Sequence, residues 1–174
     1  MKKILTILGT ITLIGTSTTS LVACNTLQEY SPEKLKELKE KKKIDTKNQE
    51  IRDNLEWITP QEKPFKEVNN KYFYIVCRNS LNNAWKVFKL KNDGKKGSGL
   101  KIDWGERPVG FIFATNNEIL LATGNLLDSS TEYIWGKGKY YEDYIKSVYR
   151  WNGEEQKLPD LIADNDGNVK VKEE

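Results

Sequence analysis

The chain has 174 residues, of which 28 are basic and 25 acidic, and it contains no histidine and only two cysteines. Without histidine it cannot form the serine or cysteine hydrolase sites that use an imidazole base, and it lacks the commonest ligand of transition metals. A net charge of +3 is too small by itself to indicate a nucleic-acid partner, which would need clustered basic residues. We therefore expect no enzymatic activity, no cofactor, no metal and no nucleic acid.

The first 23 residues have the layout of a secretion signal. Lys2 and Lys3 give a positive start, an apolar run follows from Ile4 to Ile14, and small polar residues lead towards Cys24. The apolar run is too short for a membrane-spanning helix, which needs about 20 apolar residues. We therefore expect residues 1–23 to be removed on export.

The end of this segment, Leu21-Val22-Ala23-Cys24, resembles the lipobox of bacterial lipoproteins. An aliphatic residue stands three before the cysteine and a small residue directly before it. The resemblance implies that the Cys24 thiol receives a diacylglyceryl group and that the lipid holds the protein on the outer face of the cell membrane. Each buried methylene adds about 0.8 kcal/mol of membrane affinity. Two alternatives stay open: an ordinary secretion signal with a chance cysteine, and an uncleaved membrane helix.

Cleavage before Cys24 changes the composition of the chain. Removing 23 of the 174 residues leaves 151, and losing Lys2 and Lys3 leaves 26 basic against 25 acidic side chains, a net charge of +1. That length indicates one domain. Cys77 would then have no cysteine for an intramolecular disulfide, and its apolar neighbours favour a packing role over a reactive one.

Residues 24–45 are expected to form a lipid-anchored tether and a charged helical spacer. Ser31 is a favourable N-cap, and Pro32 suits the first helical position. From Glu33 to Lys43 only two leucines are apolar, so the helix has too narrow a stripe to pack strongly. The alternative, a basic segment bound to anionic lipid, is disfavoured because lysine and glutamate are interleaved.

Residues 46–65 are expected to hold a short helix and a linker. Ile51, Leu55 and Ile58 recur at i, i+4 and i+7, which predicts a helix from Thr46 to Ile58 with one packing face. Prolines at positions 60 and 64 would end this helix.

Residues 66–174 are expected to form a mostly β domain, a small antiparallel meander or sandwich. Runs rich in aromatic and β-branched residues are separated by Asn-Asn, Asn-Gly and Asp-Gly pairs, which favour tight hairpins. The runs are Lys71–Arg78, Ala84–Lys91, Gly110–Thr115, Glu118–Thr123 and Lys146–Trp151. Asp164–Asn168 followed by Val169–Val171 predicts one more hairpin, although its Asp-x-Asp-Gly order also resembles part of a calcium loop.

Two units of this pattern are similar to each other. Val87-Phe88-Lys89-Leu90 closes the first unit before an Asn-Asp-Gly turn, and Val148-Tyr149-Arg150-Trp151 closes the second before Asn-Gly. Repeated strands with such turns resemble half-blades of β-propellers, which implies two to three propeller-blade-like hairpin repeats. A closed propeller needs at least about four blades. The domain would therefore be an open sheet, a truncated relative of longer repeat proteins, or one that a partner completes.

The signal, together with a composition rich in lysine, asparagine and isoleucine, is similar to that of surface lipoproteins of mollicutes, spiroplasmas in particular. Those cells lack a cell wall and an outer membrane. The resemblance therefore implies an anchor in the single plasma membrane, with the protein facing outward.

The candidate contact residues lie in an expected insertion into the second unit, roughly residues 128–144. They are Trp135, Lys137, Lys139, Tyr140 and Tyr141. Tyrosine and tryptophan combine large apolar faces with a polar tip, so they dominate interfaces and stack on sugars. Neighbouring glycines indicate a projecting loop in which Trp135 and Tyr140 are exposed. The alternative is that these aromatic side chains fill a small core.

These observations favour a non-enzymatic surface lipoprotein whose β domain binds a protein or glycan, on a host cell or another cell surface. One alternative is a solute-capture accessory lipoprotein of a transporter, although the chain is short for the two lobes of such subunits. Another is a lineage-specific structural protein without a dedicated ligand. The glycine-rich segment Gly94–Gly99 lacks the residue order of a phosphate-binding P-loop.

Overall fold

The structure is a computed structural model of the chain, and it describes residues 29–78, 80–93, 100–101, 109–113, 119–123, 133–138 and 140–172. The expected signal, the lipidation site Cys24, the glycine-rich segment and the contact residue Lys139 lie outside the described residues. Within these ranges no helix has the length and hydrophobicity needed to cross a membrane. The described elements are mostly strands in antiparallel sheets, which confirms the expected β class.

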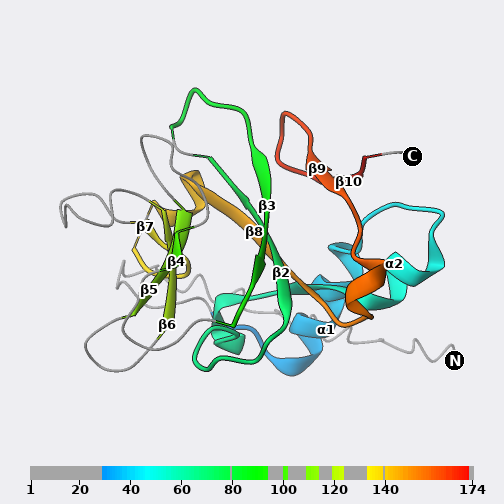
Figure 1. Cartoon of the computed structure of the whole chain (residues 1–174). Coiled ribbons are helices and arrows are strands. Elements are labelled where there is room, and N and C mark those ends of the chain that lie inside the picture. The colour runs from blue at the N-terminus through cyan, green and yellow to red at the C-terminus, as the bar shows by residue number, and fades with distance from the viewer. Residues whose placement is uncertain are drawn as a thin grey trace, which may run out of the picture.

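Four strands form the first sheet, in the order β1-β8-β2-β3 (Figure 1). They are β1 (Leu55–Ile58), β8 (Ile145–Trp151), β2 (Tyr72–Cys77) and β3 (Lys86–Lys91). The second sheet contains β4 (Leu100–Lys101), β5 (Val109–Phe113), β6 (Ile119–Thr123) and β7 (Tyr133–Ile134) in chain order, and β9 (Leu161–Ala163) and β10 (Val169–Val171) form a separate hairpin. The helices are α1 (Pro32–Lys41), α2 (Gln49–Asn54) and the short 3₁₀ helices η1 (Pro60–Glu62), η2 (Tyr141–Asp143) and η3 (Glu155–Lys157).

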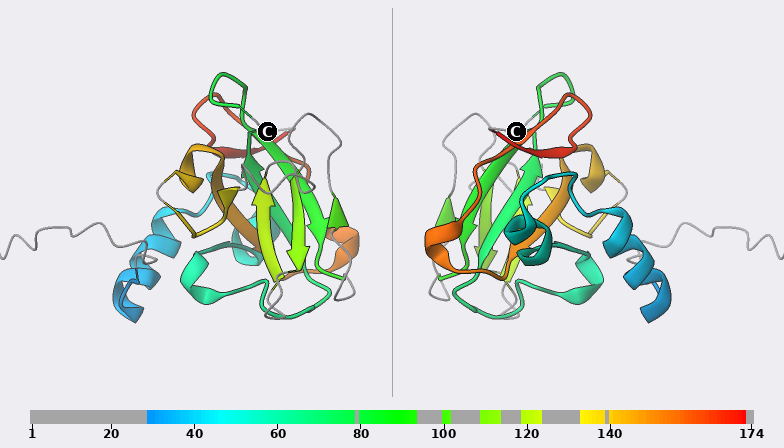
Figure 2. Two further views of the ribbon diagram at one scale, coloured as in Figure 1. Left: turned by 90° about the vertical axis from the view of Figure 1, so that its left-hand side faces the viewer. Right: turned by 90° about the vertical axis from the view of Figure 1, so that its right-hand side faces the viewer.

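The first sheet is the middle layer, because both of its faces are covered (Figures 1 and 2). Side chains alternate along β2, so that Phe73, Ile75 and Cys77 join one core cluster and Tyr74 and Val76 join the other. The second sheet completes the first cluster, and α2 with the β9–β10 hairpin completes the second. Cys77 is fully buried, which confirms its expected packing role.

Helix α1 forms where the sequence predicts it, but it does not stand away from the domain as a spacer. Ser31 Oγ accepts a hydrogen bond from the Lys34 N–H at 3.3 Å, as expected of an N-cap. Towards the other end, the Lys39 ammonium contacts Glu56 of β1 at 2.6 Å and Glu62 of η1 at 2.5 Å. No residue of α1 is fully buried, although Leu35 and Leu38 are half-buried, and these ion pairs connect the helix to β1 and η1.

Glu56 connects three elements of the fold. Its carboxylate contacts the Lys39 ammonium of α1. The same carboxylate also accepts hydrogen bonds from Arg150 of β8 at 2.6 Å and from Asn152 at 3.0 Å. Burial raises the pKa of this carboxyl, but the hydrogen bonds from Lys39, Asn152 and Arg150 outweigh burial and lower the pKa to about 2. The ionised carboxylate therefore links α1, β1 and β8 at neutral pH.

The helix predicted over Thr46–Ile58 forms only over Gln49–Asn54. The prediction is wrong for the first three residues, which precede the helix, and for the last four, which form β1. Leu55 lies opposite Trp151 and Ile58 opposite Val148, so pairing with a distant strand decides the local conformation. Apolar spacing alone does not separate a short helix from a short strand. As a result, the first sheet includes Leu55–Ile58, which precede residue 66, where the β domain was expected to begin.

The strand pairing differs from that expected of two tandem units. β2 and β3 form a hairpin, as do β5 and β6, which is what the turn residues predict. However, β8 lies between β1 and β2 instead of beside β6, whose neighbours are β5 and β7. The described pairing therefore does not reproduce the repeat, and the likeness to propeller half-blades stays a prediction.

The hairpin expected at residues 164–171 is confirmed, with β9 and β10 paired on either side of the turn. Asp164 Oδ1 accepts hydrogen bonds from the N–H groups of Asp166 at 3.0 Å and Asn168 at 2.9 Å, while Gly167 takes a φ of 81°. The carboxylate thus closes the turn in the manner of an Asx turn. In the part of the chain that the structure describes, no group of three or more acidic or cysteine side chains is arranged to hold a metal ion.

Candidate functional site

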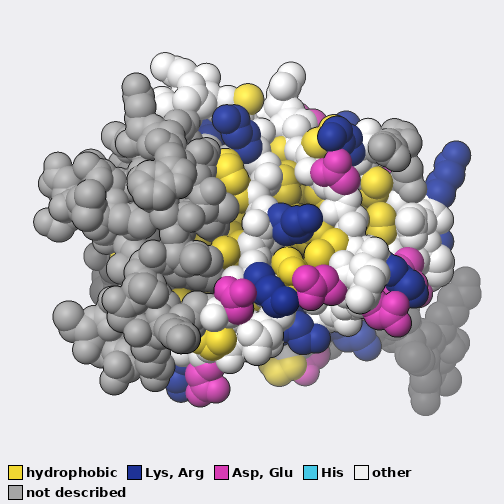
Figure 3. Space-filling view, viewed as in Figure 1, with side chains coloured by type: hydrophobic (Ala, Val, Ile, Leu, Met, Phe, Trp, Pro, Cys, Tyr) yellow, Lys and Arg dark blue, Asp and Glu magenta, His cyan; other side chains and the backbone are white. Residues whose placement is uncertain are grey.

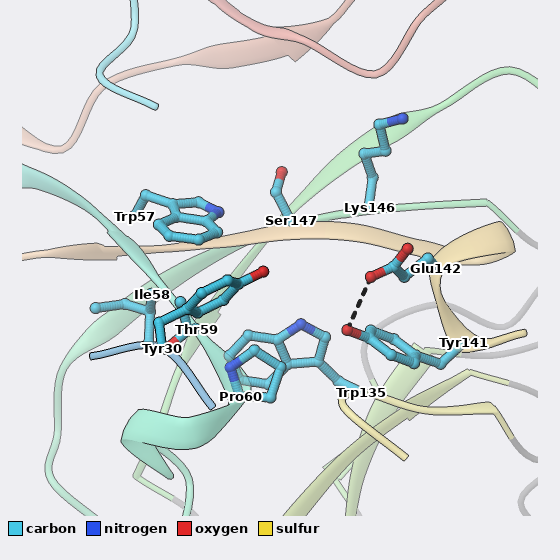
Figure 4. A pocket seen from close by; sticks show the side chains of 10 residues that line it. All are labelled: Tyr30, Trp57, Ile58, Thr59, Pro60, Trp135, Tyr141, Glu142, Lys146 and Ser147. Atoms are coloured by element: carbon cyan, nitrogen blue, oxygen red, sulfur yellow. Dashed lines mark hydrogen bonds between the residues drawn. The ribbon is translucent and has the colours of Figure 1, made fainter. Parts of the chain in front are cut away.

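A small hollow lined by aromatic side chains lies beside the first sheet, at the end of β1 (Figure 4). Its volume is about 100 Å³. The lining residues are Tyr30, Trp57, Ile58, Thr59, Pro60, Trp135, Tyr141, Glu142, Lys146 and Ser147. The aromatic members come from separate parts of the chain: the segment before α1, strand β1, the turn after β7, and η2.

The hollow exists because β8 is longer than the strand beside it. β1 ends at Ile58, opposite Val148, whereas β8 begins three residues earlier, at Ile145. On its other side β8 stays paired, with Ser147 opposite Val76 of β2. The early part of β8 therefore extends past the end of β1 and forms one wall of the hollow.

Tyr30 is brought to the hollow by hydrogen bonds to η1. Its N–H donates to Gln61 Oε1 at 2.7 Å, and Gln61 Nε2 donates to the Tyr30 carbonyl oxygen at 3.0 Å. η1 is in turn fixed by its capping residue Thr59, whose N–H donates to Glu62 Oε1 at 2.8 Å. The chain is thus held to the domain only six residues after Cys24.

Trp135 is half-buried, so the expectation that it projects as an exposed residue is wrong. Its backbone N–H donates to the Leu121 carbonyl oxygen at 3.0 Å. The indole ring packs edge-on against the Phe65 ring, with the ring centroids 5.6 Å apart. Gly136 and Gly138 follow with φ of 77° and 84°, a region that glycine adopts without steric cost. Trp135 therefore packs against the core and at the same time forms a wall of the hollow.

The two adjacent tyrosines of the contact segment have different surroundings. Tyr140 is 57% exposed, as expected, whereas Tyr141 is half-buried and lines the hollow. Burial raises the pKa of Tyr141, and the nearby Glu142 carboxylate raises it further. The Tyr141 hydroxyl donates to Glu142 Oε1 at 3.1 Å. Lys137 is exposed and does not line the hollow.

The charge that faces the hollow is negative. Glu142 lines it with a carboxylate that lies beside the Tyr141 hydroxyl (Figure 4). Lys146 also contributes to the wall, but its ammonium lies 5.7 Å from the centroid of the Trp85 ring and points away from Trp135 and Tyr141 in Figure 4. The hollow therefore presents aromatic surface and a carboxylate, which suits a small cationic or apolar group.

Two wider hollows are present on the described part of the molecule, and the first shares Lys146 and Ser147 with the aromatic hollow. One, of about 630 Å³, is lined by lysines 41, 42, 43, 146 and 170 together with Asp45 and Asp164. Several of these lysines already have acidic partners: Lys43 contacts Glu40 at 2.9 Å and Lys170 contacts Asp164 at 3.6 Å. The other, of about 510 Å³, lies beside α2 and Pro159. The face shown in Figure 3 likewise has basic and acidic side chains interspersed, without a patch of one sign.

Comparisons with known proteins give no relative. No family model matches the chain, no curated protein matches its sequence, and no solved structure matches its fold. The function therefore has to be inferred from the residues themselves, and the aromatic hollow has the most distinctive chemistry among the described surfaces.

The sequence alone singled out Trp135 and Tyr141, which the structure brings together, but it missed Tyr30 and Trp57. Tyr30 is the only aromatic residue before Trp57, in a segment that is mostly polar after Cys24. An isolated tyrosine beside a charged helix is a weak signal that the segment touches the domain. Trp57 was missed because residues 55–58 were predicted as helix, whereas they form the strand that places the Trp57 ring at the hollow.

Alanine substitutions at Trp135 and Tyr140 separate a core role from an exposed one. We expect Trp135→Ala to lower the free energy of unfolding by about 2 kcal/mol or more, because the ring packs on Phe65 and the core. Tyr140→Ala should change it by less than about 0.5 kcal/mol, since most of that side chain is exposed. Urea denaturation followed by circular dichroism measures both, and equal losses would contradict the assignment.

Proposed function

We propose that the protein is a membrane-anchored, outward-facing surface lipoprotein whose β domain is a non-enzymatic binding module for a protein or glycan. The convergence of Tyr30, Trp57, Trp135 and Tyr141 on one hollow, next to the exposed Tyr140, is the observation that carries the binding proposal. Accessible aromatic side chains gathered at a recess are typical of contact surfaces.

The anchor proposal rests on the order of the N-terminal features: positive residues, a short apolar run, and a lipobox-like Leu21-Val22-Ala23-Cys24. A diacylglyceryl group carries more than one acyl chain, which makes membrane attachment persistent. A chain spans at most about 3.3–3.6 Å per residue, so six residues from Cys24 to Tyr30 reach about 20 Å at most. The domain would therefore stay close to the bilayer.

The proposed contact surface combines the hollow with the loop beside it. Tyr140 and Lys137 are exposed there, and Lys139 belongs to the same proposal from its place in the sequence. A hollow of about 100 Å³ is well below the roughly 300–1,000 Å³ of pockets that enclose a drug-sized ligand. Its size supports contact with the surface of a larger partner over capture of a whole solute.

The anchor is tested by Cys24→Ser in the full chain. In cells fed a tagged fatty acid, the unchanged chain should be labelled and processed, because the thiol is the proposed acceptor of the lipid. The serine variant should accumulate as unlabelled precursor, measured by gel fluorescence and a shift in apparent mass. Cys77→Ser is the control and should remain labelled. Labelling that persists in Cys24→Ser would contradict the anchor.

The contact surface is tested with the double variant Lys137→Ala and Tyr140→Ala. If the loop beside the hollow binds, affinity for partners identified on an array of immobilised glycans and extracellular proteins should fall about five- to tenfold. The melting temperature should stay nearly unchanged because both side chains are exposed. Ile162→Ala, which changes an exposed side chain of β9, is the control. Unchanged affinity in the double variant would place the contact surface elsewhere.

A further inference from the structure

We infer that the aromatic hollow binds the trimethylammonium group of choline lipid headgroups in the membrane to which the chain is anchored. This lipid ligand is additional to the protein or glycan partner proposed above. Its source, the lipids of the membrane, rests on the proposed anchor at Cys24. The chemistry of the ligand follows from the side chains that line the hollow, from the volume of the hollow, and from the place where the N-terminal segment meets the domain.

The side chains of the hollow match those that recognise quaternary ammonium groups. Two tryptophans and two tyrosines surround it, and the carboxylate of Glu142 lies at its side (Figure 4). Aromatic faces attract cations through their electron-rich π systems, and cages of aromatic rings are the usual receptors of choline and methylated ammonium groups. Here the negative charge of Glu142 adds to that attraction, while the ammonium of Lys146 is directed to the Trp85 ring instead.

The volume selects a small group. An apolar cavity of about 150 Å³ admits benzene, so by proportion a hollow of about 100 Å³ admits about four non-hydrogen atoms. A trimethylammonium head, a nitrogen with three methyl carbons, has that size. A hexose ring is much larger and would only lie across the opening.

The polarity also favours a methylated cation over a primary ammonium. A primary ammonium has N–H groups that need acceptors when water is removed, whereas a quaternary ammonium has none and loses no hydrogen bonds on entering an aromatic recess. One of the Glu142 oxygens already accepts the hydrogen bond of the Tyr141 hydroxyl. That bond leaves fewer carboxylate acceptor sites for the N–H groups of a primary ammonium.

The place of Tyr30 gives the source of the ligand. Tyr30 lines the hollow itself and is held to Gln61 by two hydrogen bonds, so the N-terminal segment leaves the domain at the edge of the hollow. Since Tyr30 is the sixth residue after Cys24, which carries the proposed lipid, the hollow lies within about 20 Å of the bilayer surface. Choline headgroups in the same leaflet would then be cations of the required shape within reach of the hollow.

The first test uses the chain from residue 24 with Cys24→Ser, so that no acyl chain is present. Every strand pairing that the structure describes lies within residues 55–171, so this chain retains them. Calorimetric titration should show binding of phosphocholine and tetramethylammonium. Phosphoethanolamine and the neutral tert-butyl analogue of choline should bind at least about tenfold more weakly. Equal binding of the neutral analogue would overturn recognition of the cation.

Matched variants locate the site. Tyr30→Ala and Glu142→Gln should each weaken phosphocholine binding about five- to tenfold, because they remove one aromatic wall and the facing charge. Ile162→Ala changes an exposed side chain of β9 that does not line the hollow, so this variant should bind like the unchanged chain. Melting curves verify that each variant is folded. If Tyr30→Ala and Glu142→Gln fold and bind normally, the assignment to the hollow is wrong.

An experiment with lipid vesicles tests whether the ligand is a lipid headgroup or a soluble choline compound. The same lipid-free chain should cosediment with phosphatidylcholine vesicles and be released by phosphocholine, and it should not cosediment with phosphatidylethanolamine or phosphatidylglycerol vesicles. Binding of soluble phosphocholine without binding of the vesicles would overturn the lipid source. Because the protein in these tests has no acyl chain, their outcome is independent of whether Cys24 is lipidated in cells.

Discussion

Strand β8 lies between β1 and β2, and this pairing is the constraint on which the rest of the structure depends. Val148 is opposite Ile58 on one side and Ile75 on the other, so a strand late in the chain joins two early ones. β2 and β8 then have buried side chains on both faces, because the second sheet covers one face and α2 with the β9–β10 hairpin covers the other. Burial of this apolar area is the main stabilising contribution available to a chain with so much charge.

The same pairing creates the candidate site. Because β8 continues beyond the end of β1, the first sheet has a step, and side chains from four separate segments line the space at that step. Ion pairs of Lys39 with Glu56 and Glu62, together with the bonds between Tyr30 and Gln61, hold the N-terminal segment at the edge of that space. The point where the proposed membrane tether meets the domain is therefore also the edge of the hollow.

Local signals in the sequence predicted the local structure well. The Ser31 cap, the hairpins at β2–β3 and β5–β6, and the turn closed by Asp164 all depend on neighbouring residues, and all of them form. What sequence reasoning missed depends on distant partners: β1 was expected as helix because its strand partner is β8, and Tyr30 was expected in a tether because its partner is Gln61. Trp135 was identified as a site residue but not as a core residue, since nothing in its neighbours reveals the contact with Phe65.

The position of β8 between β1 and β2 is measured most directly by the inter-strand backbone NOEs of Val148 in isotopically labelled protein. We expect NOEs from the Val148 backbone to the backbones of both Ile58 and Ile75, because β8 is paired on two sides. Backbone NOEs from Val148 to β6 instead would show the pairing of a tandem repeat. That result would contradict the central position of β8 and, with it, the origin of the aromatic hollow.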